Sequence, residues 1–110
     1  MNEHVGTHMD APYHFNSNGW TTDQIPLERL VNVPGVVVDI SHKAQSDSGA
    51  KLEKEDLVSW VAENGEFPEG CLVLLRSGWG QYYYSNPAKF LGTNQEDFRL
   101  LKFPGISVSC

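Results

Sequence analysis

Apolar positions along the chain gather in two short runs and one helical repeat. The first run, Val36 to Ile40, is rich in β-branched residues and follows the turn-forming pair Pro34-Gly35. The second lies in the segment 71–77, with the sequence CLVLLRS. Short apolar runs between polar or turn-forming residues predict strands, and near-continuous runs predict burial on both faces of a sheet. We therefore expect two buried strands, at 36–40 and within 71–77.

A helical repeat separates the two predicted strands. Within 54–63, apolar residues recur at helical spacing, acidic residues occupy the first turn, and Gly65 follows as a stop. The apolar positions are Leu57, Trp60 and Val61. Strands that alternate with helices indicate an α/β fold.

The rest of the chain is predicted as loops and short helical segments. Residues 16–24 and 42–50 are polar and rich in turn formers, which predicts loops. Pro26 begins a short helix over 26–31, because a proline in the first turn removes a donor that has no helical partner. We also expect a turn at Gly78-Trp79-Gly80, a short turn or helix at 86–91 and a weaker helix near 94–102.

Composition narrows the class of protein. With 110 residues, 40% hydrophobic and 20% charged, the chain has the size and balance of one globular domain. Its net charge of −6 argues against a nucleic-acid partner, because phosphate backbones are bound by clustered Lys and Arg. There is no apolar run of transmembrane length, no signal peptide and no disulfide framework. We therefore expect a cytoplasmic protein with no membrane partner.

The segment HVGTHMDAPYHF, residues 4–15, concentrates His4, His8, Asp10 and His14. A helix would turn residue 10 away from residues 4 and 8, and the glycine and proline in the segment also disfavour a helix. On a straight strand, residues 4 and 8 stand about 13 Å apart at about 3.3 Å per residue, too far to share one ion. Both can bind one ion if the chain bends at Gly6. His8 and Asp10, two residues apart on an extended segment, can converge without a bend.

This mixture of imidazole and carboxylate suits zinc, manganese or iron better than calcium. Three protein ligands and an open position are typical of a catalytic metal, which lowers the pKa of a bound water and polarises a carbonyl group. His14 is then available as the general base or acid. Two alternatives stay open from the residues alone: ordinary surface or core histidines, and a structural metal site.

The pattern H-x-G-T-H-x-D-x-P-x-H resembles the motif of the metal-dependent cyclase family of hydrolases, which includes bacterial-type kynurenine formamidases and isatin hydrolases. The segments IPLERLVNVPGVVVDIS and CLVLLRSGWG resemble that family in order and spacing, so the likeness covers nearly the whole chain. The resemblance implies a swivelling β/β/α cyclase-like fold, with a mixed sheet or barrel-like β core and flanking helices. It also implies that His4, His8 and Asp10 are the metal ligands and His14 the catalytic acid/base.

The reaction implied by the resemblance is hydrolysis of N-formyl-L-kynurenine to L-kynurenine and formate, in tryptophan catabolism. The implied cofactor is a divalent metal, with Zn²⁺ placed before Mn²⁺, and the full-length form is expected to be a homo-oligomer. For the small aromatic amide, the candidate apolar wall is formed by Phe15, Trp20, Trp79 and the tyrosines 82–84. Simple packing of these aromatic side chains is the alternative.

Family members run to about twice this length and carry a further His and Glu after the region that matches FPGIS. We therefore expect residues 1–110 to form a partial, incomplete cyclase-family domain. His42 does not match the missing ligand and is predicted to be a solvated loop residue. Two rival functions remain: an inactive truncated member that binds metal or a partner subunit, and an isatin-like hydrolase of another cyclic amide.

Overall fold

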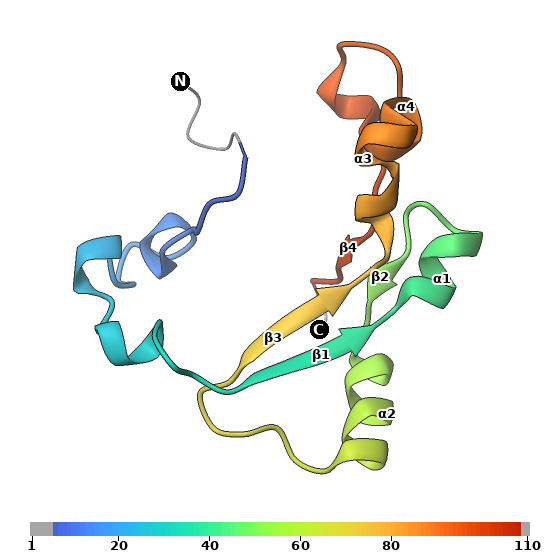
Figure 1. The fold of residues 1–110 in the computed structure, drawn as a ribbon. Helices are drawn as coiled ribbons and strands as arrows, with labels where there is room; N and C mark the ends of the chain where they lie inside the picture. The colour runs from blue at the N-terminus through green and yellow to red at the C-terminus, as the bar shows by residue number, and fades with distance from the viewer. Residues whose placement is uncertain (1–5, 109–110) are drawn as a thin grey trace. The chain divides into compact units, whose positions relative to one another are not determined.

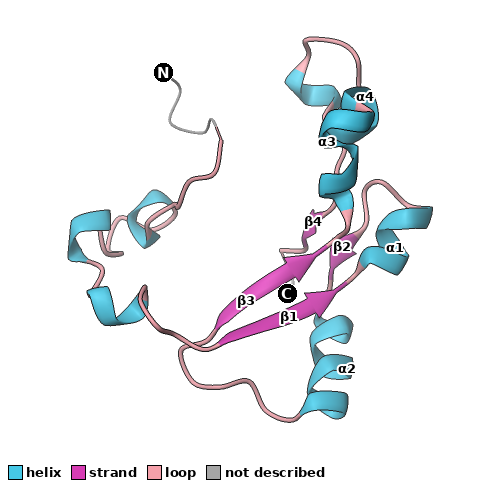
Figure 2. Ribbon diagram, viewed as in Figure 1, coloured by secondary structure: helices cyan, strands magenta, loops and turns pink. Residues whose placement is uncertain are grey.

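The computed structural model describes residues 6–108, and the chain divides into two compact units, Met1–Val33 and Pro34–Cys110 (Figure 1). The described part of the first unit contains three short 3-10 helical turns, Pro12–His14, Thr22–Gln24 and Leu27–Arg29. Among the described residues, the strands, magenta in Figure 2, and the α-helices lie in the second unit. They are β1 (Gly35–Asp39), α1 (Ser41–Ser46), β2 (Lys51–Leu52), α2 (Lys54–Asn64), β3 (Leu72–Arg76), α3 (Tyr82–Ser85), α4 (Pro87–Leu91) and β4 (Gly105–Ile106).

Two parallel strand pairs organise the second unit. Strand β1 pairs with β3 so that Val36 lies opposite Val73 and Val38 opposite Leu75, and β2 pairs with β4. The α/β class is confirmed, with parallel strands linked through helices; the described residues form no closed barrel. None of the helices between residues 6 and 108 combines the length and the apolar character that a membrane crossing requires.

The core of the second unit lies on one side of β1. Val38, Ile40 and Leu52 are buried there, and partly buried side chains from α2 and β3 pack against them. Trp60 of α2 stacks on Phe67, with ring centroids 4.6 Å apart, and its Nε1 donates a hydrogen bond of 2.9 Å to the carbonyl of Val37. This contact fastens α2 to β1, and β1 therefore has a fixed inner face.

The helix predicted at 54–63 is confirmed as α2, which ends at Gly65 with a positive φ of +91°. The short segment at 86–91 is confirmed as α4, and the turn at Gly78 is confirmed as well. Both predicted strands are present as β1 and β3.

The predicted burial of both strand faces is wrong for this chain. Burial alternates along β1, where Val37 is 50% exposed between buried Val36 and Val38. Leu72, Val73 and Leu74 of β3 are also about half exposed. The physical reason is that the core of the described residues covers one face of the pair, so apolar character alone overstated the burial.

Three local predictions also need correction. Residues 42–50 were expected to be loop, but most of them belong to α1, which buries Ala44. The helix near 94–102 is reduced to one 3-10 turn, Phe98–Leu100, and the helix at 26–31 to the turn Leu27–Arg29. In each of these last two segments, propensity without a packed apolar face sustains no more than a single turn.

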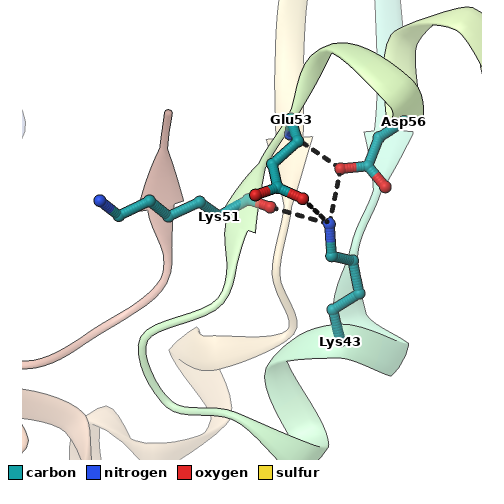
Figure 3. Close-up of polar contacts among 4 residues, drawn as sticks. All are labelled: Lys43, Lys51, Glu53 and Asp56. Atoms are coloured by element: carbon teal, nitrogen blue, oxygen red, sulfur yellow. Dashed lines mark hydrogen bonds and ion pairs between the residues drawn. The ribbon is translucent and has the colours of Figure 1, made fainter. Parts of the chain in front are cut away.

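A lysine ties α1 to the start of α2 (Figure 3). The Nζ atom of Lys43 donates hydrogen bonds to the carbonyl of Lys51 at 3.1 Å, to Glu53 Oε2 at 3.3 Å and to Asp56 Oδ2 at 2.8 Å. The Asp56 carboxylate also accepts a 2.8 Å bond from the backbone N–H of Glu53, which caps the helix. One ammonium group thus joins three consecutive elements, α1, β2 and α2.

Candidate functional site

The histidine segment bends at Gly6. This residue has φ of +78°, a left-handed conformation that glycine adopts without steric cost. The bend is the one that the sequence requires if residues on either side of Gly6 are to approach one ion. His4 lies outside the described residues, so its role as a ligand stays a prediction.

His8 and Asp10 lie side by side after the bend. The distance between His8 Nε2 and Asp10 Oδ1 is 3.7 Å, and about a third of each side chain is exposed. Nitrogen and oxygen ligands bind zinc at about 2.0–2.2 Å, which puts two ligands of a tetrahedral ion about 3.3–3.6 Å apart. The observed pair therefore fits a shared divalent ion after a shift of a few tenths of an ångström.

The other ring nitrogen of His8 is held by the backbone. Its Nδ1 lies 2.8 Å from the carbonyl oxygen of Gly6, and because a carbonyl can only accept, Nδ1 must carry the proton. In a neutral imidazole this leaves the lone pair on Nε2, the nitrogen that faces the Asp10 carboxylate. The described residues, 6–108, hold no group of three or more His, Cys, Asp or Glu side chains arranged for a metal. They supply two of the three predicted ligands.

His14 is positioned by a compact loop. Pro12–His14 form a 3-10 turn, and the chain then folds back so that the backbone N–H of Tyr13 donates to the carbonyl of Trp20 at 3.0 Å. Gly19 permits this close return, because a Cβ on it would lie 2.7 Å from the carbonyl carbon of Pro12. The polar segment 16–24, predicted as a loop, is thus an ordered return that brings later residues beside the histidines.

A pocket of about 280 Å³ collects the described site residues of the first unit. Its lining comprises His8, Met9, Asp10, Ala11, Tyr13, His14, Thr21 and Thr22. The structure therefore brings His8, Asp10 and His14 to one concave surface, as the sequence predicts. Tyr13, Thr21 and Thr22 were missed. Tyr13 stands between Pro12 and His14, two fixed residues of the motif, whereas the threonines gave no signal.

The aromatic candidates differ in their surroundings. Phe15 is 81% exposed and makes an edge contact with the His14 ring at 4.9 Å between centroids. Trp20 is partly exposed, and the Arg29 guanidinium lies over its ring at 5.6 Å. Neither residue lines the pocket, although both lie on the loop that carries His14. Their contact with substrate stays a prediction.

Trp79 lies in the core of the second unit, where 6% of its surface is exposed. Its Nε1 donates a 2.9 Å hydrogen bond to the carbonyl of Phe90, and Tyr82 packs against it edge to face. These contacts match the packing alternative for Trp79. His42 is exposed, as expected, but it lies on α1 rather than in a loop.

Comparison with known proteins identifies a family and individual proteins that are similar to this chain. A family model described as "Putative cyclase" matches residues 1–110. An isatin hydrolase of Roseibium aggregatum is 36% identical over 84 residues, which cover 72% of this chain and 31% of that protein. A kynurenine formamidase of Salinibacter ruber is 44% identical over 46 residues, which cover 42% of this chain and 21% of that protein.

Two solved structures of isatin hydrolases are also similar to this chain. The crystal structure of an isatin hydrolase bound to the product analogue thioisatinate matches 97% of this chain and 40% of its own, with a TM-score of 0.76 and 31% identity. Isatin hydrolase A from Labrenzia aggregata, bound to benzyl benzoate, matches 89% of this chain and 37% of its own, with a TM-score of 0.71 and 32% identity. The cyclase-like fold is thus confirmed. The chain spans less than a third of the length of the curated relatives it matches.

Proposed function

The chain belongs to the cyclase family, and from that membership we propose that it carries the metal-binding and proton-transfer segment of a hydrolase acting on aromatic amides. The observation that carries the proposal is the pocket in which His8, Asp10 and His14 meet. The relatives named for hydrolysis, an isatin hydrolase and a kynurenine formamidase, support the reaction class.

The proposed cofactor is one divalent ion, with Zn²⁺ placed before Mn²⁺, held by His4, His8 and Asp10. When bound, such an ion supplies a Lewis acid for the amide carbonyl and lowers the pKa of water. The protein's part is to hold the donors in place. His8 presents Nε2 because its Nδ1 is bonded to Gly6, and Asp10 adds a negative charge 3.7 Å away.

His14 is proposed to move the proton. It lines the same pocket as the ligands, and its ring lies against that of Phe15. From there the imidazole takes a proton from the attacking water and returns it to the leaving nitrogen. The nitrogen leaves as an aromatic amine. Tyr13, which lines the pocket, is proposed to offer apolar surface for its ring, and Phe15 and Trp20 remain candidates on the same loop outside the lining.

Two substrates share this chemistry. N-Formyl-L-kynurenine and isatin both present an amide whose nitrogen is attached to a benzene ring, so hydrolysis breaks the same kind of C–N bond. The first belongs to tryptophan catabolism, as the motif implies. The second is favoured by the isatin hydrolase that matches 72% of this chain. The remaining proposal is an inactive family member. It would bind metal or a partner subunit, which includes a second copy of this chain.

The experiment is a hydrolysis assay on purified protein with added Zn²⁺ or Mn²⁺. Each substrate is incubated with the chain itself and with a chimera in which these residues replace the matching segment of the Roseibium isatin hydrolase. Turnover that is lost in His8→Ala and Asp10→Ala supports the proposal, and the ratio of the two rates identifies the substrate. Metal binding without turnover in the chimera supports the inactive member. A chimera whose rate does not depend on His8 contradicts the proposed site.

A further inference from the structure

The hydrogen bond between His8 and Gly6 bears on the orientation of the His8 ring as well as on the bend of the chain. His8 Nδ1 donates to the Gly6 carbonyl over 2.8 Å, across a separation of two residues. Such a short link requires the Gly6 peptide to turn its oxygen back toward the His8 ring. The left-handed conformation of Gly6, with φ of +78°, accompanies this arrangement.

Position 6 favours glycine because of its backbone conformation, and not because a side chain would lack space. A Cβ built on Gly6 meets no atom within 4 Å, so a larger side chain would not collide with its surroundings. The cost of replacement is the positive φ, which β-branched residues avoid and asparagine tolerates. The site thus separates a backbone effect from a packing effect.

We propose that Gly6 is a positioning residue whose carbonyl fixes the tautomer and the ring orientation of His8. The bond places the proton on Nδ1 and leaves the lone pair on Nε2, which lies 3.7 Å from Asp10 Oδ1. In metal sites, a partner on the second ring nitrogen of a histidine orients the ligand and raises its basicity. Here that partner is a backbone carbonyl inside the motif. The inference deepens the proposed metal site and rests on it for its purpose.

The test uses two substitutions at Gly6 and one control elsewhere. Gly6→Val disfavours the positive φ of this position, whereas Gly6→Asn tolerates a positive φ more readily. Gly70→Val is the matched control, because Gly70 has φ of +69° and its Cβ would also meet no atom within 4 Å, yet it lies outside the first unit. The amide spectrum of each variant checks that the protein is folded.

The first readout is the tautomer of His8 in the metal-free protein, from long-range ¹H–¹⁵N NMR at about pH 8, where model histidines are neutral. We expect the Nδ1–H form in the wild type, Gly6→Asn and Gly70→Val, and a shift toward the Nε2–H form in Gly6→Val. A wild type with the proton on Nε2, or a Gly6→Val spectrum identical to the wild type, would overturn the proposal.

The second readout is the dissociation constant for Zn²⁺, measured by calorimetric titration. Loss of such a partner weakens metal binding by about 10- to 100-fold, and we expect this loss in Gly6→Val with near-complete rescue in Gly6→Asn. Equal weakening in both variants would overturn the positioning role. If the wild type binds no Zn²⁺, the proposed metal site fails, and the tautomer measurement still decides the role of Gly6.

Discussion

The Nζ atom of Lys43 lies 2.8 Å from Oδ2 of Asp56, joining helix α1 to helix α2. Both side chains are mostly buried, with 28% and 19% of their surfaces exposed. Replacement of Lys43 by Met leaves the Asp56 carboxylate with one hydrogen bond fewer and without the ammonium group in contact with it. We expect the free energy of unfolding to fall by about 1–2 kcal/mol, measured by urea denaturation.

Lys54→Met is the control for this loss, because Lys54 is an exposed lysine at the start of the same α2. It removes the same charge without touching Asp56, so its unfolding free energy should stay close to that of the wild type. Equal effects of the two substitutions would show that net charge, and not the contact, stabilises this region.

The same pair predicts how stability depends on pH. Burial raises the pKa of Asp56, but hydrogen bonds from Lys43 and the Glu53 backbone outweigh it and hold that pKa below 3.8. A carboxyl group with a lowered folded-state pKa stabilises the fold above its unfolded pKa, and this contribution is lost as the pH falls through the folded value. We expect urea midpoints to drop more steeply below about pH 4 in the wild type than in Asp56→Asn.

At alkaline pH the dependence of stability on pH has the opposite sign, because the Lys43 contribution is lost as the pH rises. The hydrogen bond to Asp56 raises the pKa of Lys43 above 10.5. Its contribution is therefore complete below that pH and is lost as the pH rises through the folded value. Urea midpoints measured from pH 9 to 12 should fall in the wild type and fall less in Lys43→Met. Parallel curves would argue that Lys43 does not change its pKa on folding.

Gly19 is predicted to control the geometry of the proposed acid/base. A Cβ there would lie 2.7 Å from a backbone carbon and 2.8 Å from the carbonyl oxygen of Pro12, so Gly19→Ala must open the loop that carries His14. A misplacement of about 1 Å can reduce turnover roughly 10²-fold. We expect that loss of kcat with zinc still bound. Gly80→Ala, whose Cβ meets nothing within 4 Å, is the control and should retain its rate.

The proposed roles of the polar residues predict different outcomes for metal and rate. His8→Ala and Asp10→Ala should lose zinc and turnover together, because an ion with one or two ligands is held weakly. His14→Ala should retain zinc and lose about 10²–10⁴ in rate. Elemental analysis and the hydrolysis rate are measured on the same preparations. Loss of zinc from His14→Ala as complete as that from His8→Ala would make His14 a ligand instead.

Tyr13 is predicted to contribute to substrate binding. It lines the pocket beside His14 and stands between two fixed residues of the motif. Tyr13→Ala should raise KM about 5- to 30-fold for an aromatic amide, equivalent to about 1–2 kcal/mol of lost contact, with kcat little changed. Phe103→Ala, at an aromatic side chain that is 52% exposed in the second unit and is not a site candidate, should alter neither constant. An unchanged KM in Tyr13→Ala would place the aromatic ring elsewhere.

The sequence predicted those parts of the chain whose pattern is local and repeated. Helix α2 was found because apolar residues recur along it and Gly65 ends it. The approach of His8 to Asp10 was found because an extended backbone dictates where residues two apart lie. Helix α1 was missed because its sequence SHKAQS buries only Ala44 and shows no apolar period. Strand β2 was missed because two residues carry no pattern.

The burial of each strand face and the return of the loop 16–24 toward the histidines were harder to predict from the sequence. An apolar run does not reveal which of its faces is covered, and Val37 is half exposed although both neighbours are buried. The arrival of Thr21 and Thr22 beside the histidines depends on the close approach of Gly19 to Pro12. That approach arises from the three-dimensional course of the loop, which a polar composition does not specify.

The contrast between Trp20 and Trp79 gives the chain two built-in optical probes. Trp20 is 44% exposed in the first unit, whereas Trp79 is 6% exposed within an apolar cluster of the second. Indole fluorescence shifts to longer wavelength in polar surroundings, so the two side chains should emit at different wavelengths. Trp60→Phe keeps an aromatic ring at this position but loses the hydrogen bond to Val37. In this variant, denaturation followed at the red and blue edges of the emission would report on the surroundings of Trp20 and Trp79 separately.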